Sequence, residues 1–385
     1  MSFRKTVMTA GFAMFSMFFG SGNLVFPLVI GTQTVDNMGY AMLGLAITGV
    51  IVPFLGLLGV ILYAGNRSNY FACIGKVPAF FLTFIMLAMM GPVGVLPRCI
   101  IVAYGGITLF APSFPFPLFS ALFCLITALL VWNHDRIIPI IGRILTPALM
   151  VGIITISVAG LMFSEPQTAV SQFSPNESFK LGLFEGYQIM DLLAAFFFSA
   201  TTVSYIRAHM RSDDSPKKLL KLSLVASLIG AGFIGLIYLS FVALGAKHAP
   251  LLQQVSPEQM FATVAGHALG PIAVPIVAIT IALACLTTAV VLAMLFADFI
   301  HEDISKYKFG QHKAVILTLI ISFLVSLVGF SSLRVWLGAV LEIAYPALIV
   351  LTLANIANKL WNVPHWGKWG FWITVSVSII YNYII

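Results

Sequence analysis

The stretch MFFGSGNLVFP, residues 17–27, interrupts an apolar run that is otherwise long enough to cross a membrane as one helix. Its centre, Gly20 to Asn23, is made of poor helix formers, and Pro27 follows four residues later. Backbone N–H and C=O groups that are freed inside hydrocarbon are costly unless they find polar partners. The stretch therefore predicts a broken helix whose exposed backbone groups bind something polar.

The composition of the whole chain supports a membrane setting. The 385 residues are 60% hydrophobic and 9% charged, with a mean hydropathy of +1.03. A soluble domain needs roughly 25% charged residues to cover its surface. We expect an all-α polytopic membrane protein that has lipid as its solvent.

Apolar runs of spanning length, separated by turn signals, predict about eleven transmembrane helices. They lie near residues 7–31, 39–64, 79–110, 117–132, 137–163, 183–206, 219–246, 270–300, 313–330, 333–355 and 369–385.

The basic residues indicate how the chain is oriented. With a cytoplasmic N-terminus, sixteen of the 20 Lys and Arg residues fall in cytoplasmic segments, Lys180, Lys247 and Arg334 fall in external segments, and Arg98 lies within a span. This distribution follows the positive-inside rule. The net charge of +7 therefore reflects insertion into the cell (inner) membrane, and we expect no nucleic-acid partner.

A second interruption is expected in the sixth span, where FFFSATT (196–202) places small and hydroxyl residues after a phenylalanine run. The first and sixth spans run in opposite directions, and paired broken spans of this kind are typical of inverted-repeat transporters. Alternatively, the Gly and Ser residues only let neighbouring helices pack closely.

Two broken helices would offer N–H groups to a carboxylate and C=O groups to a cation, which suits a zwitterion and a small monovalent cation. Phenylalanines around the breaks favour a ligand with an apolar side chain, although each also reads as a packing or lipid-facing residue. The flanking apolar residues are Phe15, Phe18, Phe19, Met190, Phe196, Phe197 and Phe198.

In ALACLTTAVVL (282–292), the residues Ala284, Thr287 and Thr288 share one helix face. Their hydroxyl and carbonyl oxygens form half of a site for a hard cation. The competing interpretation is that each threonine bonds a carbonyl of its own helix.

Ionisable residues at membrane depth are costly, by about 2.5–3.5 kcal/mol for an isolated Arg or Asp. We expect Arg98 and Asp191 to form an ion pair; alternatively, Arg98 faces a water-filled vestibule or the substrate carboxylate. Glu342, in the tenth span, is a separate candidate for protonation or cation contact.

The sequence carries no motif for hydrolysis or nucleotide binding: H-E-x-x-H, G-x-S-x-G and the P-loop pattern are all absent. We expect a protein that is not an enzyme and needs no cofactor.

Five segments together resemble the branched-chain amino acid:cation symporter family, the BrnQ-like carriers within the amino acid–polyamine–organocation superfamily. They are FFGSGNLVFPLVIG, GPVGVLPR, GYQIMD, ACLTTA and AYPAL, in the order and spacing of that family. The resemblance covers essentially the whole chain. It implies a leucine-transporter-type fold with repeats over 1–163 and 164–355, helices 1 and 6 broken, and an accessory helix over 356–385.

The resemblance also implies roles for individual residues. It implies a substrate pocket formed by Phe19, Ser21, Gly22, Asn23, Phe198, Ser199, Ala200 and Thr201. It implies a sodium ion between spans one and eight, held by the carbonyls of Ser16, Phe19 and Ala284 and the hydroxyls of Thr287 and Thr288.

The expected function is sodium-coupled import of leucine, isoleucine and valine by alternating access, with no obligate protein partner. Proton-coupled or sodium-independent carriage of neutral amino acids is an alternative, as is a non-transporting amino acid receptor of the same fold. The chain departs from the family in two respects, since the family usually has twelve spans and Glu342 lies outside its pattern.

Overall fold

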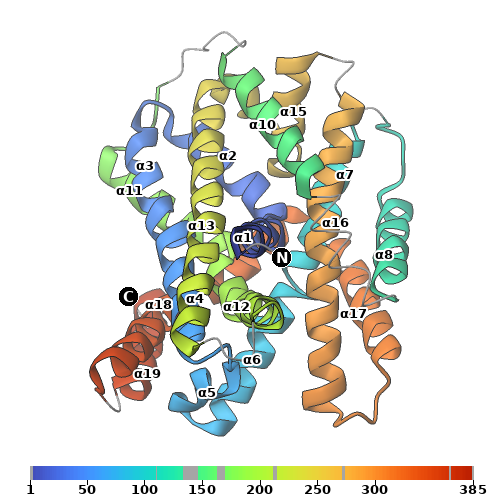
Figure 1. The fold of residues 1–385 in the computed structure, drawn as a ribbon. Coiled ribbons are helices and arrows are strands. Elements are labelled where there is room, and N and C mark those ends of the chain that lie inside the picture. Colours follow the sequence, from blue (N-terminus) through green and yellow to red (C-terminus); the bar gives the residue numbers. More distant parts are fainter. Residues whose placement is uncertain are drawn as a thin grey trace.

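The computed structural model describes residues 3–109, 111–132, 146–162, 170–210, 215–270, 274–363 and 366–383, and these residues form helices and connecting turns without strands. The helices stand side by side as a bundle with short connections at its two ends (Figure 1). The all-helical prediction is confirmed for this part of the chain.

The first half of the bundle contains nine described α-helices of spanning or connecting length. They are α1 (Phe3–Phe18), α2 (Ser21–Thr34), α3 (Met38–Ala46), α4 (Val52–Leu62), α5 (Arg67–Phe71), α6 (Lys76–Met90), α7 (Val95–Ile107), α8 (Phe116–Trp132) and α10 (Thr146–Met162). A π-helical turn, Ile47–Ile51, joins α3 to α4.

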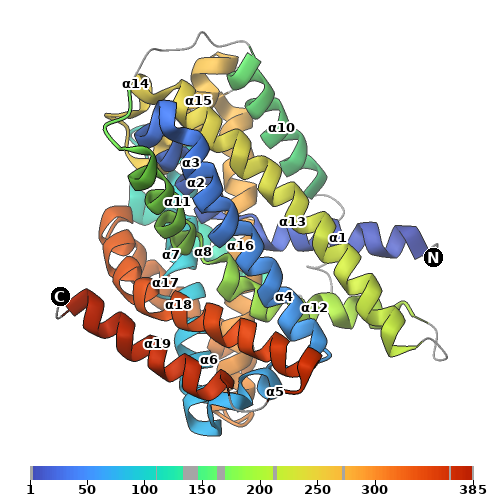
Figure 2. The same ribbon diagram turned by 90° about the vertical axis from the view of Figure 1, so that its left-hand side faces the viewer.

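The second half begins with α11 and ends with α19, which lies against α18 (Figure 2). Its helices are α11 (Pro175–Ile189), α12 (Asp191–Ala208), α13 (Pro216–Lys247), α14 (Ala249–Leu252), α15 (Pro257–Leu269), α16 (Val274–Phe299), α17 (Gln311–Ser326), α18 (Phe330–Trp361) and α19 (Trp366–Tyr383).

Among the described residues, five helical segments are long and apolar enough to cross a membrane, and α11 with α12 form a sixth if the bent pair is one span. The segments α1, α8, α10 and α17 are apolar but shorter. The protein is therefore an integral membrane protein, while the count of eleven spans stays a prediction.

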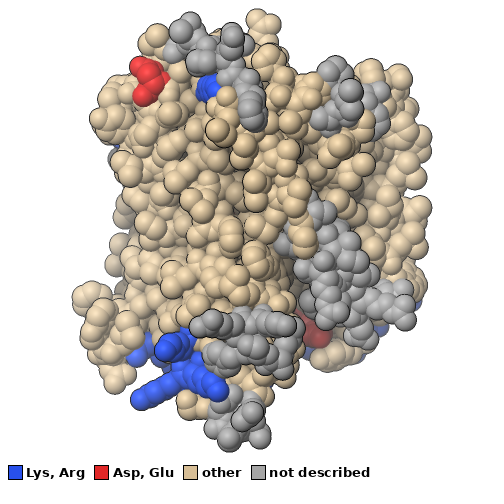
Figure 3. Space-filling model, turned by 45° about the horizontal axis from the view of Figure 1, so that its top comes forward, with Lys and Arg blue, Asp and Glu red and all other residues tan. Residues whose placement is uncertain are grey.

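The charged side chains follow the same pattern. Figure 3 shows a largely uncharged face with Lys and Arg gathered near its lower end. A wide uncharged belt of this kind is what contact with lipid requires.

Two pairs of helices pack backbone against backbone. A Cβ atom on Gly31 of α2 would lie 2.0 Å from the carbonyl oxygen of Val242 in α13, and one on Gly245 would lie 2.3 Å from that of Leu28. Small residues permit such close approach between membrane helices. Since a methyl group does not fit at either position, α2 and α13 form a tight pair.

The pair α3 and α11 is built in the same way. A Cβ atom on Gly44 would lie 2.2 Å from the carbonyl oxygen of Phe179, and one on Gly182 would lie 2.1 Å from that of Ala41. These four helices include the halves of the first and sixth spans that lead to the candidate site.

Candidate functional site

The first span is broken where the sequence predicts. Helix α1 ends at Phe18 and α2 begins at Ser21, with Phe19 and Gly20 between them. The Gly20 N–H donates to Oδ1 of Asn23 at 2.8 Å, so the asparagine side chain closes the first turn of α2. The first N–H groups of a helix have no backbone acceptor within it, and Ser21 and Gly22 carry two of these groups at this end of α2.

The sixth span is also broken, but the prediction that the break lies in 196–202 is wrong. Residues Asp191–Ala208 form the continuous helix α12, and the break is at Met190, where the chain bends by 43°. Met190 is left-handed (φ 67°, ψ 20°), a conformation that is unfavourable for a residue with a Cβ atom. A tertiary contact supports it, because the Leu192 N–H donates to the Tyr345 hydroxyl of α18 at 3.1 Å.

A small cavity lies between the two breaks. It measures about 20 Å³ as the space open to the centre of a water molecule, which is room for about one water. Helices α6, α7 and α16 complete its wall. The lining residues are Met17, Phe18, Gly20, Ser21, Gly22, Asn23, Met90, Val95, Ile189, Met190, Asp191, Ala194, Phe198, Thr288 and Leu292.

Half of the expected substrate residues line this cavity. Ser21, Gly22, Asn23 and Phe198 do so, while Phe19, Ser199, Ala200 and Thr201 do not. The last three lie farther along α12 than the break, and the Ser199 hydroxyl donates to the Phe196 carbonyl of its own helix at 3.3 Å.

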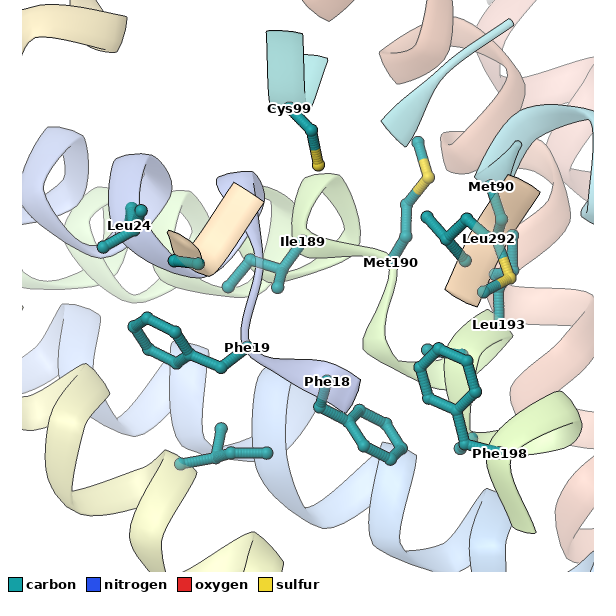
Figure 4. Close-up of a cluster of buried hydrophobic side chains, with 14 of the residues drawn as sticks. Phe18, Phe19, Leu24, Met90, Cys99, Ile189, Met190, Leu193, Phe198 and Leu292 are labelled. Carbon is teal, nitrogen blue, oxygen red and sulfur yellow. The ribbon is translucent and has the colours of Figure 1, made fainter. Parts of the chain in front are cut away.

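Apolar side chains form most of the cavity wall. The rings of Phe18 and Phe198 extend toward one another (Figure 4), with centroids 5.3 Å apart in an edge-to-face arrangement. Met90, Met190 and Leu292 lie together on another side of the cavity in the same view. This wall is suited to an apolar ligand side chain.

Asp191 places a carboxylate at the break, and its partners are neutral. The Tyr238 hydroxyl of α13 donates to Oδ2 of Asp191. The Asn23 amide contacts both carboxylate oxygens at 3.3 and 3.4 Å and also donates to the Tyr238 hydroxyl. The expected Arg98–Asp191 ion pair is therefore not formed.

Arg98 instead binds the end of α11. Its guanidinium donates to the backbone oxygen and to the side-chain Oε1 of Gln188, both at 2.8 Å, and lies 5.2 Å from the centre of the Phe26 ring. The last C=O groups of a helix carry a partial negative charge, so a buried cation is stabilised there. Nearby, the guanidinium of Arg334 in α18 pairs with Glu185 of α11.

The residues expected to hold sodium lie where α1 meets α16. The Thr288 hydroxyl donates to the Phe19 carbonyl across the two helices at 3.1 Å, and the Thr287 hydroxyl donates to the Ala284 carbonyl at 2.9 Å. Ser16 is fully buried, and its hydroxyl has no hydrogen-bond partner among the described residues. The close approach requires Gly20, where a Cβ atom would lie 2.8 Å from Thr288 Oγ1.

Glu342 does not belong to this site. Its side chain is exposed on α18 and does not line the cavity. The neighbouring Leu341 and Tyr345 point into the bundle instead. The hypothesis that Glu342 lines the pathway is not supported by this position.

Sequence reasoning named Met190 as an apolar residue beside the site but missed the break at its position, and it missed Ile189 and Tyr238 altogether. No glycine or proline marks the break at Met190, so composition gave no signal there. A lone tyrosine within an apolar span was the available clue for Tyr238, because a buried tyrosine hydroxyl needs a hydrogen-bond partner.

The fold is shared with solved membrane transporters. The structure aligns with MhsT in complex with L-phenylalanine at a TM-score of 0.64, with 14% identity over 97% of both chains. It aligns with Mhp1, a nucleobase-cation-symport-1 family transporter, at a TM-score of 0.63, with 13% identity over 96% of this chain and 85% of that one. These similarities define the class as a leucine-transporter-type membrane transport fold.

The chain belongs to the branched-chain amino acid transport protein family, whose model matches residues 3–384. A relative from Staphylococcus saprophyticus, provisionally named a branched-chain amino acid carrier protein, is 29% identical over 91% of this chain and 81% of its own. A relative of the same name from Staphylococcus aureus strain RF122 is 28% identical over 92% and 83%. The protein is thus an amino acid transporter rather than an enzyme, as the sequence predicts.

Proposed function

We propose that this protein imports leucine, isoleucine and valine together with sodium by alternating access. The observation that carries the proposal is the pair of helices broken on either side of one small cavity, with an apolar wall and exposed helix ends. Half-helix ends of this kind bind the charged groups of a substrate and its coupling ion in secondary transporters.

The proposed orientation of the substrate follows from the two kinds of wall. Its carboxylate accepts hydrogen bonds from the N–H groups of Ser21 and Gly22 at the positive end of α2. Its branched side chain packs against Phe18, Phe198 and Met190. Because the cavity is far smaller than an amino acid, α1 and α12 must separate to admit it.

The proposed sodium ion would take the place of two hydrogen bonds. One runs from the Thr288 hydroxyl to the Phe19 carbonyl, and the other from the Thr287 hydroxyl to the Ala284 carbonyl. Every proposed ligand is an oxygen atom, the ligand type that hard cations prefer. These oxygen atoms come from Ser16, Phe19, Ala284, Thr287 and Thr288. The unpartnered Ser16 hydroxyl adds a polar atom at the same end of α1. Bound there, the ion would fasten α1 to α16 and so favour one conformation of the carrier.

The moving unit in this proposal consists of spans one, two, six and seven. The glycine contacts join α2 to α13 and α3 to α11, which are members of those four spans. The proposed repeats, 1–163 and 164–355, each contribute two of the four, and 356–385 adds the accessory helix α19.

The ion gradient is sufficient for accumulation. Moving one positive charge through about 100 mV yields roughly 2.3 kcal/mol. A tenfold sodium gradient adds about 1.4 kcal/mol. Together they support an accumulation of about several hundredfold for one ion per substrate.

Uptake of labelled leucine into proteoliposomes tests the proposal. We expect uptake to require an inward sodium gradient, to increase with an inside-negative potential, and to be competed by isoleucine and valine. Undiminished uptake without sodium, driven by a pH gradient, would establish proton coupling instead. Leucine binding without counterflow would identify a receptor.

The threonine pair provides a sharper test. Replacing Thr287 and Thr288 by Ala removes two proposed sodium ligands, and we expect the sodium concentration for half-maximal uptake to rise at least about tenfold. Thr318→Ala is the matched control, because Thr318 is also buried and bonds its own helix at Ala314. Equal sodium dependence in the double variant and the control would place the ion elsewhere.

A further inference from the structure

Asp191 is a buried carboxylate without a cationic partner among the described residues. Arg98 and Arg334 bind elsewhere, the buried Arg98 at Gln188 and the partly exposed Arg334 at Glu185. Removing a carboxylate from water is costly unless it is paired, and neutral donors compensate only part of that cost. A cation that arrives from the cavity would complete the compensation.

The carboxylate also retains hydrogen-bonding capacity. A carboxylate has about four acceptor positions. Oδ2 of Asp191 accepts from Tyr238, whereas the contact of Oδ1 is a long one, 3.4 Å from the Asn23 amide. Contacts of that length are weak, so Oδ1 is free to accept a stronger donor.

The position of Asp191 relative to α2 determines which donor fits. Asn23, in the first turn of α2, contacts Asp191 directly and caps the Gly20 N–H. The N–H groups that begin α2 and the Asp191 carboxylate therefore lie within a turn of each other, on the wall of one cavity. An α-amino acid carries its carboxylate and its ammonium on a single carbon, which matches a positive and a negative site at this spacing.

Packing holds the carboxylate in this place. The π-helical turn Ile47–Ile51 brings Gly49 against the ring of Tyr238, where a Cβ atom would lie 3.1 Å from the ring. The Tyr238 hydroxyl then reaches Asp191. Asp191 is also in the first turn of α12, where the helix dipole favours a negative charge.

We infer that Asp191 binds the α-ammonium group of the substrate and restricts transport to molecules with a protonated amine. The inference rests on the proposed function and adds the group that selects for the amine. Hydroxy acids with the same carbon skeleton bind poorly, because their hydroxyl leaves the buried carboxylate without a cation.

The experiment compares the binding of leucine with that of 2-hydroxy-4-methylpentanoate to purified protein by calorimetry, with uptake measured in parallel. In the wild type we expect leucine to bind at least about 100-fold more tightly. In Asp191→Asn, which keeps the shape and an acceptor for Tyr238, we expect this ratio to fall to within about threefold. Asp298→Asn, a carboxylate at the far end of α16 that contacts Gln311, is the matched control and should keep the ratio.

Each other outcome has a definite meaning. A wild type that binds both compounds within about threefold overturns the inference, even if Asp191→Asn does not fold. An unchanged ratio of leucine binding to hydroxy-acid binding in Asp191→Asn also overturns the inference. So does a variant that binds leucine as the wild type does but whose uptake no longer depends on pH, a result that would make Asp191 a proton carrier. If the wild type accumulates no leucine at all, the proposed function fails instead.

Discussion

At the scale of single residues, the buried charges of this protein are compensated by helix ends and neutral donors as much as by opposite charges. Arg98 and Asp191 were both identifiable from the sequence as ionisable residues at membrane depth. Their partners were not identifiable, because Gln188 and Tyr238 reach them from α11 and α13 through the tertiary arrangement.

His248, beyond the end of α13, gives a prediction at the same scale. Burial lowers the pKa of its imidazole, against the opposing effect of a hydrogen bond to the Gly160 carbonyl at 3.2 Å, and His267 and Lys247 lower it further. The unfolded chain therefore binds a proton more readily than the folded protein. Stability is fully present above about pH 6.5 and falls as the pH decreases below it.

We expect the melting temperature of the purified protein to decrease between pH 7.5 and pH 5.5, and His248→Gln to flatten that part of the profile. His209→Gln, at the exposed end of α12, serves as the control. Identical pH profiles in the wild type and His248→Gln would show that His248 does not contribute.

At the scale of elements, the two helix breaks differ in how well the sequence predicts their positions. The first is encoded locally, since Gly20 to Asn23 disfavour helix and Asn23 closes the new turn itself. The second lies at Met190, between helix-forming residues, and depends on Tyr345 of a distant helix. Local propensity therefore predicted one break correctly and placed the other a few residues too late.

The contact between Phe18 and Phe198 gives a prediction for the motion of α1 against α12. If sodium fastens α1 to α16, Phe198 becomes less accessible when sodium and leucine are bound. We expect a maleimide to label Phe198→Cys, in a background with Cys73 replaced by Ser, at least about tenfold more slowly with both ligands present. Glu302→Cys, at an exposed position beyond α16, should be labelled at the same rate with or without ligands.

At the scale of the whole molecule, composition and hydropathy were sufficient for the fold class. The helices of the described residues overlap the predicted apolar segments, although for 137–163 the structure describes only 146–162, and the number that cross the membrane stays a prediction. The positions of helices relative to one another were not predictable, because they depend on pairs such as Gly31 with Val242 that lie far apart in the sequence.

The predicted orientation can be checked on intact cells. We expect a membrane-impermeant maleimide to label a cysteine at Gln172 or Ser256 from outside, and one at Lys308 only after the membrane is opened. These positions lie at opposite ends of the bundle. The reverse labelling pattern would place the N-terminus outside the cell and would contradict the orientation predicted from the charge distribution.

The glycine contacts have a mechanical consequence. Where main chain rests directly on main chain, no flexible side chain remains between α2 and α13 or between α3 and α11 to absorb a displacement. Each pair is stiff, so bending must concentrate where regular hydrogen bonding is interrupted, at Gly20 and at Met190. The residues at which the chain bends would then also be the residues that bind the ligand. A bound ligand would therefore resist the hinge motion that the empty site permits.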